Sequence, residues 1–330
     1  SYRKIQTEEI NMHNKKPTIY LVAVDMDGTL LHDDKSISDY TLDVLRKIVK
    51  KEKPDIIHLH SSKAGALGRL LVGTGKAKMF YTPHGYSFLM ENESGIKQQI
   101  YKTMEKILEK RKCLTVACGK SEWEQSRIVT KNSTYISNGV NIDKLNANLI
   151  NANEQNLEDF NIKKNVFTAY TVGRINYQKW PELFNEIAQK LPEMQFVWIG
   201  DGDMRDKLTA DNIVITGWLE HKEAMELSTK FDTFILASRY EGLPISLLEA
   251  MYMKKACVVS NVVGNRDVIK NDYNGYICDE TDQFVEALKD IEKGNSDKLI
   301  EQAYSDILNE FNSKCLCNKY KEVYNESRSK

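Results

Sequence analysis

Two glutamates beside a Gly-Leu-Pro turn are the side chains of this chain best placed to do chemistry. Residues 238–251 read SRYEGLPISLLEAM, in which Glu241 and Glu249 are separated by seven residues. An apolar strand enters this segment, and the turn predicts a helix that begins near Ile245, with free N–H groups pointing beyond the strand end. Such a helix start can bind an anion. One carboxylate would lie at the mouth of a cleft and the other one turn inside the helix, an arrangement that suits a nucleotide-sugar.

Two cations follow a second apolar run. Arg174 and Lys179 lie five positions apart, directly after the run 166–173, which ends on Gly173. Two positive charges at such a helix entry can neutralise a departing diphosphate, whose negative charge develops in the transition state. The alternative interpretation is a solvated helix start.

Histidines occupy the ends of two further runs. His84, in TPHGYSF, precedes a glycine that lets the backbone approach a ligand. Its imidazole can donate a hydrogen bond to a sugar hydroxyl or a phosphate, although a lone histidine of this kind is more often structural. His58 and His60 share one face of a predicted strand, and only His60 stands at its end.

The segments IGDGDMRD and ITGWLE add a turn and an exposed aromatic candidate. We expect the turn at Gly200 to line a nucleotide pocket. Trp218 and Leu219 would sit near the base, because an indole can cover a flat ring. An aromatic side chain packed on the rim of its own domain is the alternative.

Composition indicates an ordinary globular protein. The chain has 330 residues, of which 41% are hydrophobic and 28% charged, and its formal net charge is −1. This length predicts about two domains of roughly 100–200 residues each. Since no large basic field exists, we expect no nucleic-acid partner.

Cysteine usage and hydropathy predict a cytoplasmic protein. The six cysteines form neither a CxxC pair nor a metal-ligand rhythm, so we expect reduced thiols and no metal site. No apolar run approaches the roughly 20 residues that span a bilayer. The N-terminus SYRKIQTEEINMHNKK has no signal-peptide core.

Short apolar runs alternate with amphipathic stretches along the chain. The first series comprises 18–24, 55–60, 78–84, 114–119 and 134–139, and the second comprises 166–173, 195–200, 212–217, 232–238 and 256–261. This alternation predicts an α/β fold with parallel sheets in two doubly wound domains, over 1–145 and 146–330. Their distinctive polar residues stand at strand ends, where such sheets bind ligands. The last helix could pack back on the first domain.

From about Lys50 to about Glu326 the chain resembles a family 4 retaining glycosyltransferase. The matching segments are KPDIIHLHSSKAG, YTPHGYSF, VACGKSEWE, YISNGVN, VGRINYQKWPEL, IGDGDMRDKL, ITGWLE, SRYEGLPISLLEAM and VVGNRDVI. The resemblance implies two facing Rossmann-like domains of the GT-B type, with a shortened N-terminal domain. It implies transfer of a sugar from a UDP- or GDP-sugar to a sugar or lipid-linked sugar, in cell-surface polysaccharide or glycolipid synthesis, with no obligatory metal.

The same resemblance implies roles for single residues. Arg174 and Lys179 would hold the donor diphosphate and Glu249 the ribose. Glu241 and His84 would face the transferred sugar. With the strand-end positions above, the expected donor contacts are Arg174, Lys179, Gly200, Trp218, Leu219, Glu241, Gly242, Leu243, Pro244 and Glu249.

The N-terminus departs from that pattern. Residues 19–48, IYLVAVDMDGTLLHDDKSISDYTLDVLRKI, resemble the opening of a haloacid-dehalogenase-type phosphatase, with Asp25 as nucleophile and Asp27 as general acid/base beside Mg²⁺. The later partners of such a phosphatase are missing after Ile48. The chain is therefore interpreted as a fusion, and a Mg²⁺-dependent phosphatase or a scaffold that only binds nucleotide are the alternatives to transfer.

A basic amphipathic helix is predicted over residues 95–113. Its apolar residues, Ile96, Ile100, Met104, Ile107 and Leu108, share one face, and five lysines and Arg111 lie elsewhere. Such a helix can make a peripheral contact with an anionic membrane at its inner face. A helix packed in the core by its apolar face is the favoured interpretation.

Overall fold

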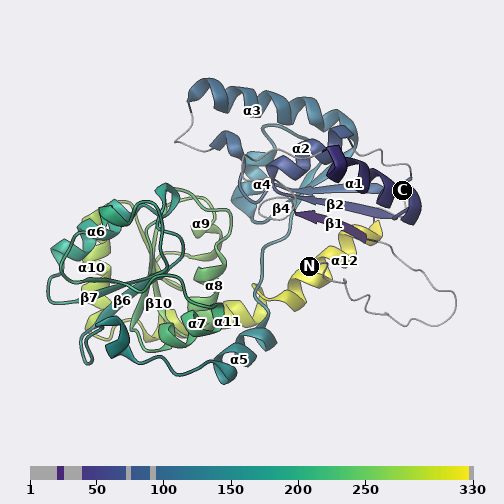
Figure 1. The fold of residues 1–330 in the computed structure, drawn as a ribbon. Coiled ribbons are helices and arrows are strands. Elements are labelled where there is room, and N and C mark those ends of the chain that lie inside the picture. Colours follow the sequence, from purple (N-terminus) through teal and green to yellow (C-terminus); the bar gives the residue numbers. More distant parts are fainter. Residues whose placement is uncertain (1–20, 26–38, 72–75, 90–93, 327–330) are drawn as a thin grey trace.

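The computed structural model describes residues 21–25, 39–71, 76–89 and 94–326. Figure 1 shows two α/β bodies joined by extended chain, with the last helix, α12, reaching from the second body to the first. Within the described residues no helix is both long and apolar enough to cross a membrane.

The first body is built on a five-stranded parallel sheet in the order β1-β2-β3-β4-β5. The strands are β1 (Leu21–Asp25), β2 (Ile56–His60), β3 (Lys78–Thr82), β4 (Cys113–Ala117) and β5 (Ser133–Tyr135). The helices are α1 (Asp39–Glu52), α2 (Ser62–Leu71), η1 (Ser87–Leu89), α3 (Gly95–Leu108), η2 (Glu109–Arg111) and α4 (Lys120–Ser126). Consecutive strands are neighbours, so each helix crosses over between adjacent strands.

The second body has a six-stranded sheet in the order β11-β10-β9-β6-β7-β8. The strands are β6 (Thr168–Val172), β7 (Gln195–Ile199), β8 (Ile213–Ile215), β9 (Thr233–Leu236), β10 (Ala256–Ser260) and β11 (Tyr276–Cys278). The helices are α5 (Ile142–Asn151), η3 (Leu157–Phe160), η4 (Tyr177–Lys179), α6 (Pro181–Lys190), η5 (Arg205–Lys207), α7 (His221–Thr229), α8 (Ile245–Tyr252), α9 (Asn265–Val268), α10 (Thr281–Glu292), α11 (Asp297–Asn309) and α12 (Ser313–Glu326). The chain order reverses between β6 and β9.

Both faces of the second sheet are buried, which explains its continuous apolar strands. Tyr170 and Phe234 belong to a core with α7, α8 and α11, while their neighbours Ala169 and Ile235 belong to a core with α6 and α10. Successive strand residues thus point to opposite helical layers. The two bodies with parallel sheets confirm the predicted α/β fold class, and among the described strands the chain order reverses in the second sheet alone.

The last helix, α12, packs against the first body. Leu316, Tyr320, Val323 and Tyr324 of α12 recur at helical spacing and pack against a small core that includes Phe80. The boundary predicted between residues 145 and 146 falls within α5, which packs on α7. We therefore propose to place the domain boundary before α5.

The helix α3 does not pack as its periodicity suggested. Ile96, Ile100 and Ile107 are 77%, 51% and 57% exposed, so the interpretation of an apolar face packed in the core is wrong for them. The buried residues of the helix are Glu105 and Leu108. The face that contains Glu105 can be buried because a cation from α2 neutralises it.

That cation is Arg69. Its Nη2 lies 2.8 Å from Glu105 Oε2, and the two side chains are 3% and 10% exposed. Its Nε donates to the Gly65 carbonyl oxygen at 2.7 Å, and the Tyr81 hydroxyl donates to Glu105 Oε1 at 3.1 Å. The ion pair therefore fastens α2, α3 and β3 together.

We predict that Arg69→Met lowers the free energy of unfolding by about 3–5 kcal/mol, because it leaves the Glu105 carboxylate buried without its cation. The matched control is Lys164→Met, which removes an exposed pair with Glu158 at 2.9 Å and should produce no measurable change. Urea unfolding followed by circular dichroism measures both. Equal losses in the two variants would contradict the assignment of Arg69 as the structural cation.

Candidate active site

The candidate site lies where the second sheet reverses its order. β6 pairs with β7 on one side and β9 on the other, and all of these pairs are parallel. Ligands of doubly wound sheets bind beyond the carboxyl ends of strands at such a switch point. The chain that leaves β6 carries Arg174 and Lys179, and the chain that leaves β9 carries Glu241.

An ion pair joins these two loops. Lys179 Nζ lies 2.7 Å from Glu241 Oε1, and the side chains are 16% and 7% exposed. The Ser238 hydroxyl donates to the same oxygen at 2.6 Å, and Gln178 Nε2 donates to Glu241 Oε2 at 3.3 Å. Three donors from two loops thus fix this carboxylate, and the structure brings together two residues that the sequence singled out separately.

Local sequence positions Lys179. Asn176 caps the short helix η4 by accepting a hydrogen bond from the Lys179 N–H at 3.1 Å. Trp180 then takes a positive φ of 50°, which ends η4, and Pro181 opens α6. The lysine therefore stands at a tight corner between two helices.

Arg239 fastens that corner to the loop after β9. Its Cζ lies 4.4 Å from the centre of the Tyr177 ring and 4.3 Å from the Trp180 ring. Its backbone N–H donates to the Gln178 carbonyl oxygen at 2.8 Å. Sequence reasoning missed Arg239, although an arginine after a strand opposite two nearby aromatic residues is a usable signal.

Arg174 stands apart from the ion pair. It is exposed, and its Cζ lies 5.9 Å from the ring centre of Trp218, whose side chain is 62% exposed. Leu219, in contrast, packs partly buried against the core. The site edge therefore offers an open indole beside a cation, while Leu219 contributes mainly to packing.

Glycines let two strand-end turns approach closely. Gly173 and Gly200 have φ values of 146° and 141°, and a Cβ on Gly200 would lie 2.1 Å from the Gly173 carbonyl oxygen. The Trp198 indole N–H donates to that oxygen at 2.8 Å. Gly200 is thus required by backbone packing, and its expected donor contact stays a prediction.

Glu249 has a partner of its own. Its Oε1 lies 2.8 Å from Nε2 of His221, the first residue of α7, and the two side chains are 14% and 48% exposed. The hydrogen bond to Glu249 raises the pKa of His221 above its ordinary value. Glu241 and Glu249 therefore bind different partners, a lysine and a histidine. Sequence reasoning missed His221, because nothing in the sequence shows that α7 and α8 meet.

The turn between these glutamates touches the first body. A Cβ on Gly242 would lie 3.4 Å from Cys118 Sγ and 3.6 Å from the His84 carbonyl carbon. Asn138 Nδ2 donates to the Leu243 carbonyl oxygen at 3.3 Å. Leu243 and Pro244 are themselves buried, and α8 begins at Ile245 as predicted.

His84 lies in the first body, after β3, on the side that meets the Gly242 turn. It is exposed and has a φ of 53°. Its Nε2 lies 3.0 Å from Nδ1 of His60, and the two rings are stacked with centroids 5.2 Å apart. Glu122 helps to fix the loop, because its carboxylate accepts hydrogen bonds from the backbone N–H groups of Gly85 and Cys118. His84 thus faces the Gly242 turn across the two bodies.

His58 lies behind this pair and is closed off from solvent. It is 1% exposed, with Nδ1 2.7 Å from the Tyr324 hydroxyl and Nε2 2.9 Å from Thr82 Oγ1. Burial, followed by the charges of His60 and His84, lowers its pKa to about 3. The buried imidazole is therefore neutral, and it connects α12 with the histidines of the site.

The two aspartates of the phosphatase alternative are only partly within the described residues. Asp25 ends β1, where its backbone is in register with His60, and Asp27 lies outside the described ranges. The described part of the chain holds no group of three or more His, Cys, Asp or Glu side chains arranged to bind a metal ion.

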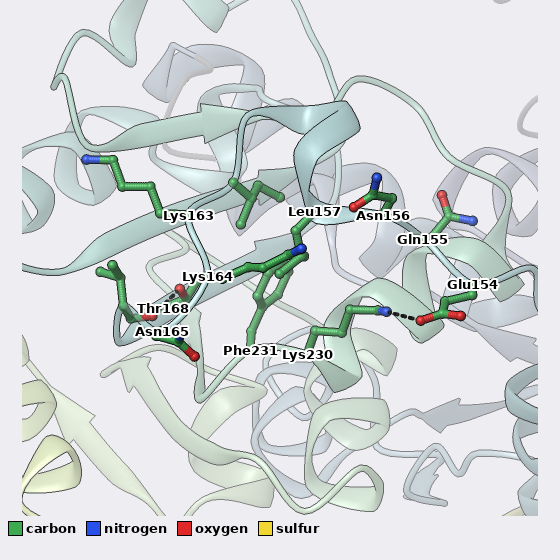
Figure 2. A pocket seen from close by; sticks show the side chains of 12 residues that line it. Glu154, Gln155, Asn156, Leu157, Lys163, Lys164, Asn165, Thr168, Lys230 and Phe231 are labelled. Atoms are coloured by element: carbon green, nitrogen blue, oxygen red, sulfur yellow. Dashed lines mark hydrogen bonds and ion pairs between the residues drawn. The ribbon is translucent and has the colours of Figure 1, made fainter.

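A separate cavity of about 620 Å³ opens near the amino ends of β6 and β9. Figure 2 shows Lys163, Lys164 and Lys230 around it, with Lys230 Nζ 3.6 Å from Glu154 Oε1. None of the residues predicted to contact the donor lines this cavity.

The pKa shifts of His58 and His221 predict opposite pH dependences of stability. The folded-state pKa of His58, about 3, lies below its ordinary value of 6.5, so this residue costs stability as the pH falls below about 6.5. The pKa of His221 is raised above 6.5, so its contribution is full below that pH and is lost as the pH rises through the folded-state pKa.

We therefore expect the stability gap between wild type and His58→Asn to narrow as the pH falls from 7 toward 4. The gap between wild type and His221→Asn should be widest in the same acid range and disappear in alkali. Thermal unfolding from acid through neutral to alkaline pH measures both gaps. Gaps that change in the same direction would contradict at least one assignment.

Two family models match successive parts of the chain. Residues 13–144 match glycosyltransferase family 4, and residues 152–306 match glycosyl transferases group 1. The first match includes residues 19–48, so the segment that resembles a phosphatase opening lies within a glycosyltransferase match. The interpretation of the chain as a fusion with a phosphatase segment has no support in these comparisons.

Solved structures with the same fold come from several glycosyltransferases. Sucrose-phosphate synthase from Thermosynechococcus elongatus superposes with a TM-score of 0.75 at 16% identity, over 87% of this chain and 77% of that one. Anabaena HepE in complex with UDP and glucose gives 0.71 at 16% identity, over 86% and 82%. These similarities show the GT-B arrangement of two Rossmann-like domains.

Two curated relatives come from Escherichia coli. The UDP-Gal:alpha-D-GlcNAc-diphosphoundecaprenol alpha-1,3-galactosyltransferase is 30% identical over 324 residues, which cover 90% of this chain and 80% of that protein. The O-antigen biosynthesis glycosyltransferase WbnH is 26% identical over 82% of this chain and 80% of its own. With such similarity over most of both chains and family matches in both halves, this chain belongs to the family 4 and group 1 glycosyltransferases.

Proposed function

We propose that this enzyme transfers a hexose from a UDP-sugar to a hydroxyl of a lipid-linked sugar, with retention of anomeric configuration, in cell-surface polysaccharide synthesis. The observation that carries the proposal is the Lys179–Glu241 ion pair at the switch point of the second sheet. The relatives supply the substrate classes, since one acts on an undecaprenol-linked acceptor and HepE was crystallised with UDP and glucose.

The donor diphosphate is assigned to the two cations. Lys179 is held at a fixed corner, and Arg174 stands exposed five positions earlier in the same loop. Positive charge at this place stabilises the leaving UDP, whose negative charge grows as the bond to the sugar breaks. Because two side chains supply this charge, we propose that transfer has no obligatory need for a metal.

The nucleoside is assigned to the outer part of the same body. Trp218 exposes an indole that can cover the base, beside the guanidinium of Arg174. Glu249 can accept hydrogen bonds from the ribose hydroxyls, because one of its oxygens is already oriented by His221. The backbone N–H groups of Gly242 and Leu243, in the turn before α8, are assigned to the phosphates and complete this half.

The transferred sugar is assigned to the gap between the bodies. Glu241 lies on one side and His84 on the other, and Gly242 brings the two loops into contact. The bond between the sugar and the diphosphate breaks while a bond to the acceptor oxygen forms, and the acceptor proton passes to the departing phosphate. In such a single step, retention requires both events on one face of the sugar, which places the acceptor beside Lys179.

The acceptor class sets the proposed location. A sugar attached to a lipid diphosphate is presented at a membrane surface. We therefore propose a cytoplasmic enzyme that works at the inner face of the membrane. No second function is proposed, because no described contact favours the phosphatase alternative at Asp25 and Asp27.

Binding of UDP tests the donor site. We expect saturating UDP, at about 100 times its Kd, to stabilise the wild type by about 2.7 kcal/mol. Lys179→Ala and Glu249→Ala should lose most of the rise in melting temperature, because they remove the diphosphate and ribose contacts. Each variant is compared with its own ligand-free protein, so that only the UDP-induced rise counts.

The matched control is Lys163→Ala, an exposed lysine on the separate cavity of Figure 2, which should keep the full rise. Transfer from UDP-galactose to an undecaprenol-linked acceptor should fall about 10²–10³-fold in Lys179→Ala. An undiminished UDP response in both site variants would refute the assigned donor site. A loss confined to Lys163→Ala would move the nucleotide to the separate cavity.

A further inference from the structure

The helix α3 presents an apolar stripe to the outside of the first body. Ile96, Ile100, Met104 and Ile107 are 77%, 51%, 41% and 57% exposed. Their spacing places them on one face of the helix. Figure 1 shows α3 at the outer edge of the first body, away from the second body. Four large exposed side chains on one helix face are unusual for a surface in contact with water alone.

The opposite face of α3 holds the helix in place. Leu108 is 3% exposed and Glu105 is 8% exposed, and Glu105 is paired with Arg69 of α2. The stripe therefore cannot turn inward without breaking a buried ion pair. Its exposure is a fixed property of the folded domain.

Positive charge accompanies the stripe. Lys106 in α3, Lys110 and Arg111 in η2, and Lys112 after it are exposed, in a chain whose formal net charge is −1. The acidic residues of this stretch are engaged elsewhere, since Glu105 binds Arg69 and Glu109 accepts a hydrogen bond from the Lys131 N–H at 2.9 Å. An apolar face beside a concentrated positive charge is complementary to anionic lipid.

A second copy of the chain fits this surface poorly. In a two-fold dimer the same patch faces itself, so the cations at the C-terminal end of the helix would be brought toward their own copies or left unpaired. An anionic bilayer meets the apolar and the charged groups at once. The charge on this surface therefore favours lipid over self-association.

The position of α3 connects this surface with the candidate active site. The loop that carries His84 leads through Tyr86 into η1, and η1 packs against α3. A bilayer that held α3 would also hold this loop at a fixed height above the lipid surface. The sugar gap would then open toward an acceptor whose lipid tail is embedded in the same membrane.

We propose that α3 is the membrane-docking element of this enzyme, lying on an anionic phospholipid surface with its apolar stripe in the acyl boundary and its cations among the phosphates. This proposal deepens the proposed function by naming the surface that meets the acceptor's membrane. It is tested without donor or acceptor, so its outcome does not depend on transfer activity.

The test is flotation of the purified full chain with vesicles of phosphatidylcholine, with or without phosphatidylglycerol. We expect binding to the anionic vesicles that weakens as salt is added. The variant Ile96→Ser/Ile100→Ser/Ile107→Ser should bind at least about tenfold more weakly, because it removes most of the apolar stripe. The variant Lys106→Gln/Lys110→Gln/Arg111→Gln should lose about tenfold or more at low salt.

The matched control is Ile150→Ser, which alters an isoleucine that is 80% exposed on α5 of the other body and should leave binding unchanged. Absence of wild-type flotation, or equal loss in the control, overturns the proposal. Sedimentation velocity tests the alternative that a second copy of the chain covers the stripe. If the wild type does not bind lipid but forms a dimer, and the isoleucine variant is a monomer, the stripe serves self-association. Vesicle binding without sugar transfer would contradict the proposed function alone.

Discussion

The Lys179–Glu241 ion pair is the constraint on which the candidate site depends. The two side chains come from loops 62 positions apart in the sequence, and they meet because β6 and β9 are neighbours. In the ligand-free protein Glu241 neutralises the cation that we assign to the donor phosphates. On this assignment we expect a diphosphate to share or replace this carboxylate and thereby free Glu241 to accept hydrogen bonds from the sugar. Charge is thus arranged before the donor arrives, as electrostatic catalysis requires.

A chain of side-chain contacts in the first body holds His84 in place opposite this ion pair. His84 rests on His60, and His60 stacks on buried His58 with ring centroids 4.2 Å apart. His58 is in turn held by Tyr324, which α12 carries back from the second body. The helix α12 follows the second body in the chain but packs against the first body. It therefore connects the body that carries Glu241 with the body that carries His84. The contact at Gly242 links them a second time, close to the proposed sugar.

Much of the fold could be predicted from sequence, because apolar runs bounded by polar strand ends are typical of buried parallel strands. The helix start at Ile245 followed from its turn chemistry. Pairings between distant segments could not be predicted: His221 with Glu249 and Tyr324 with His58 depend on how helices pack. The orientation of α3 was misjudged because periodicity shows that a helix has an apolar face, but not which face is buried. The strand β11 was missed because only its three residues, Tyr276–Cys278, are apolar, and polar residues and a glycine flank them directly.

The most direct measurement of the central claim is a crystal structure of the chain with UDP-galactose or UDP. We expect the diphosphate to lie against Lys179 and Arg174, the ribose against Glu249 and the uracil beside Trp218, with Glu241 and His84 on either side of the sugar position. Nucleotide bound in the cavity beside Lys163 and Lys230, or a diphosphate that leaves Lys179 without contact, would contradict this assignment.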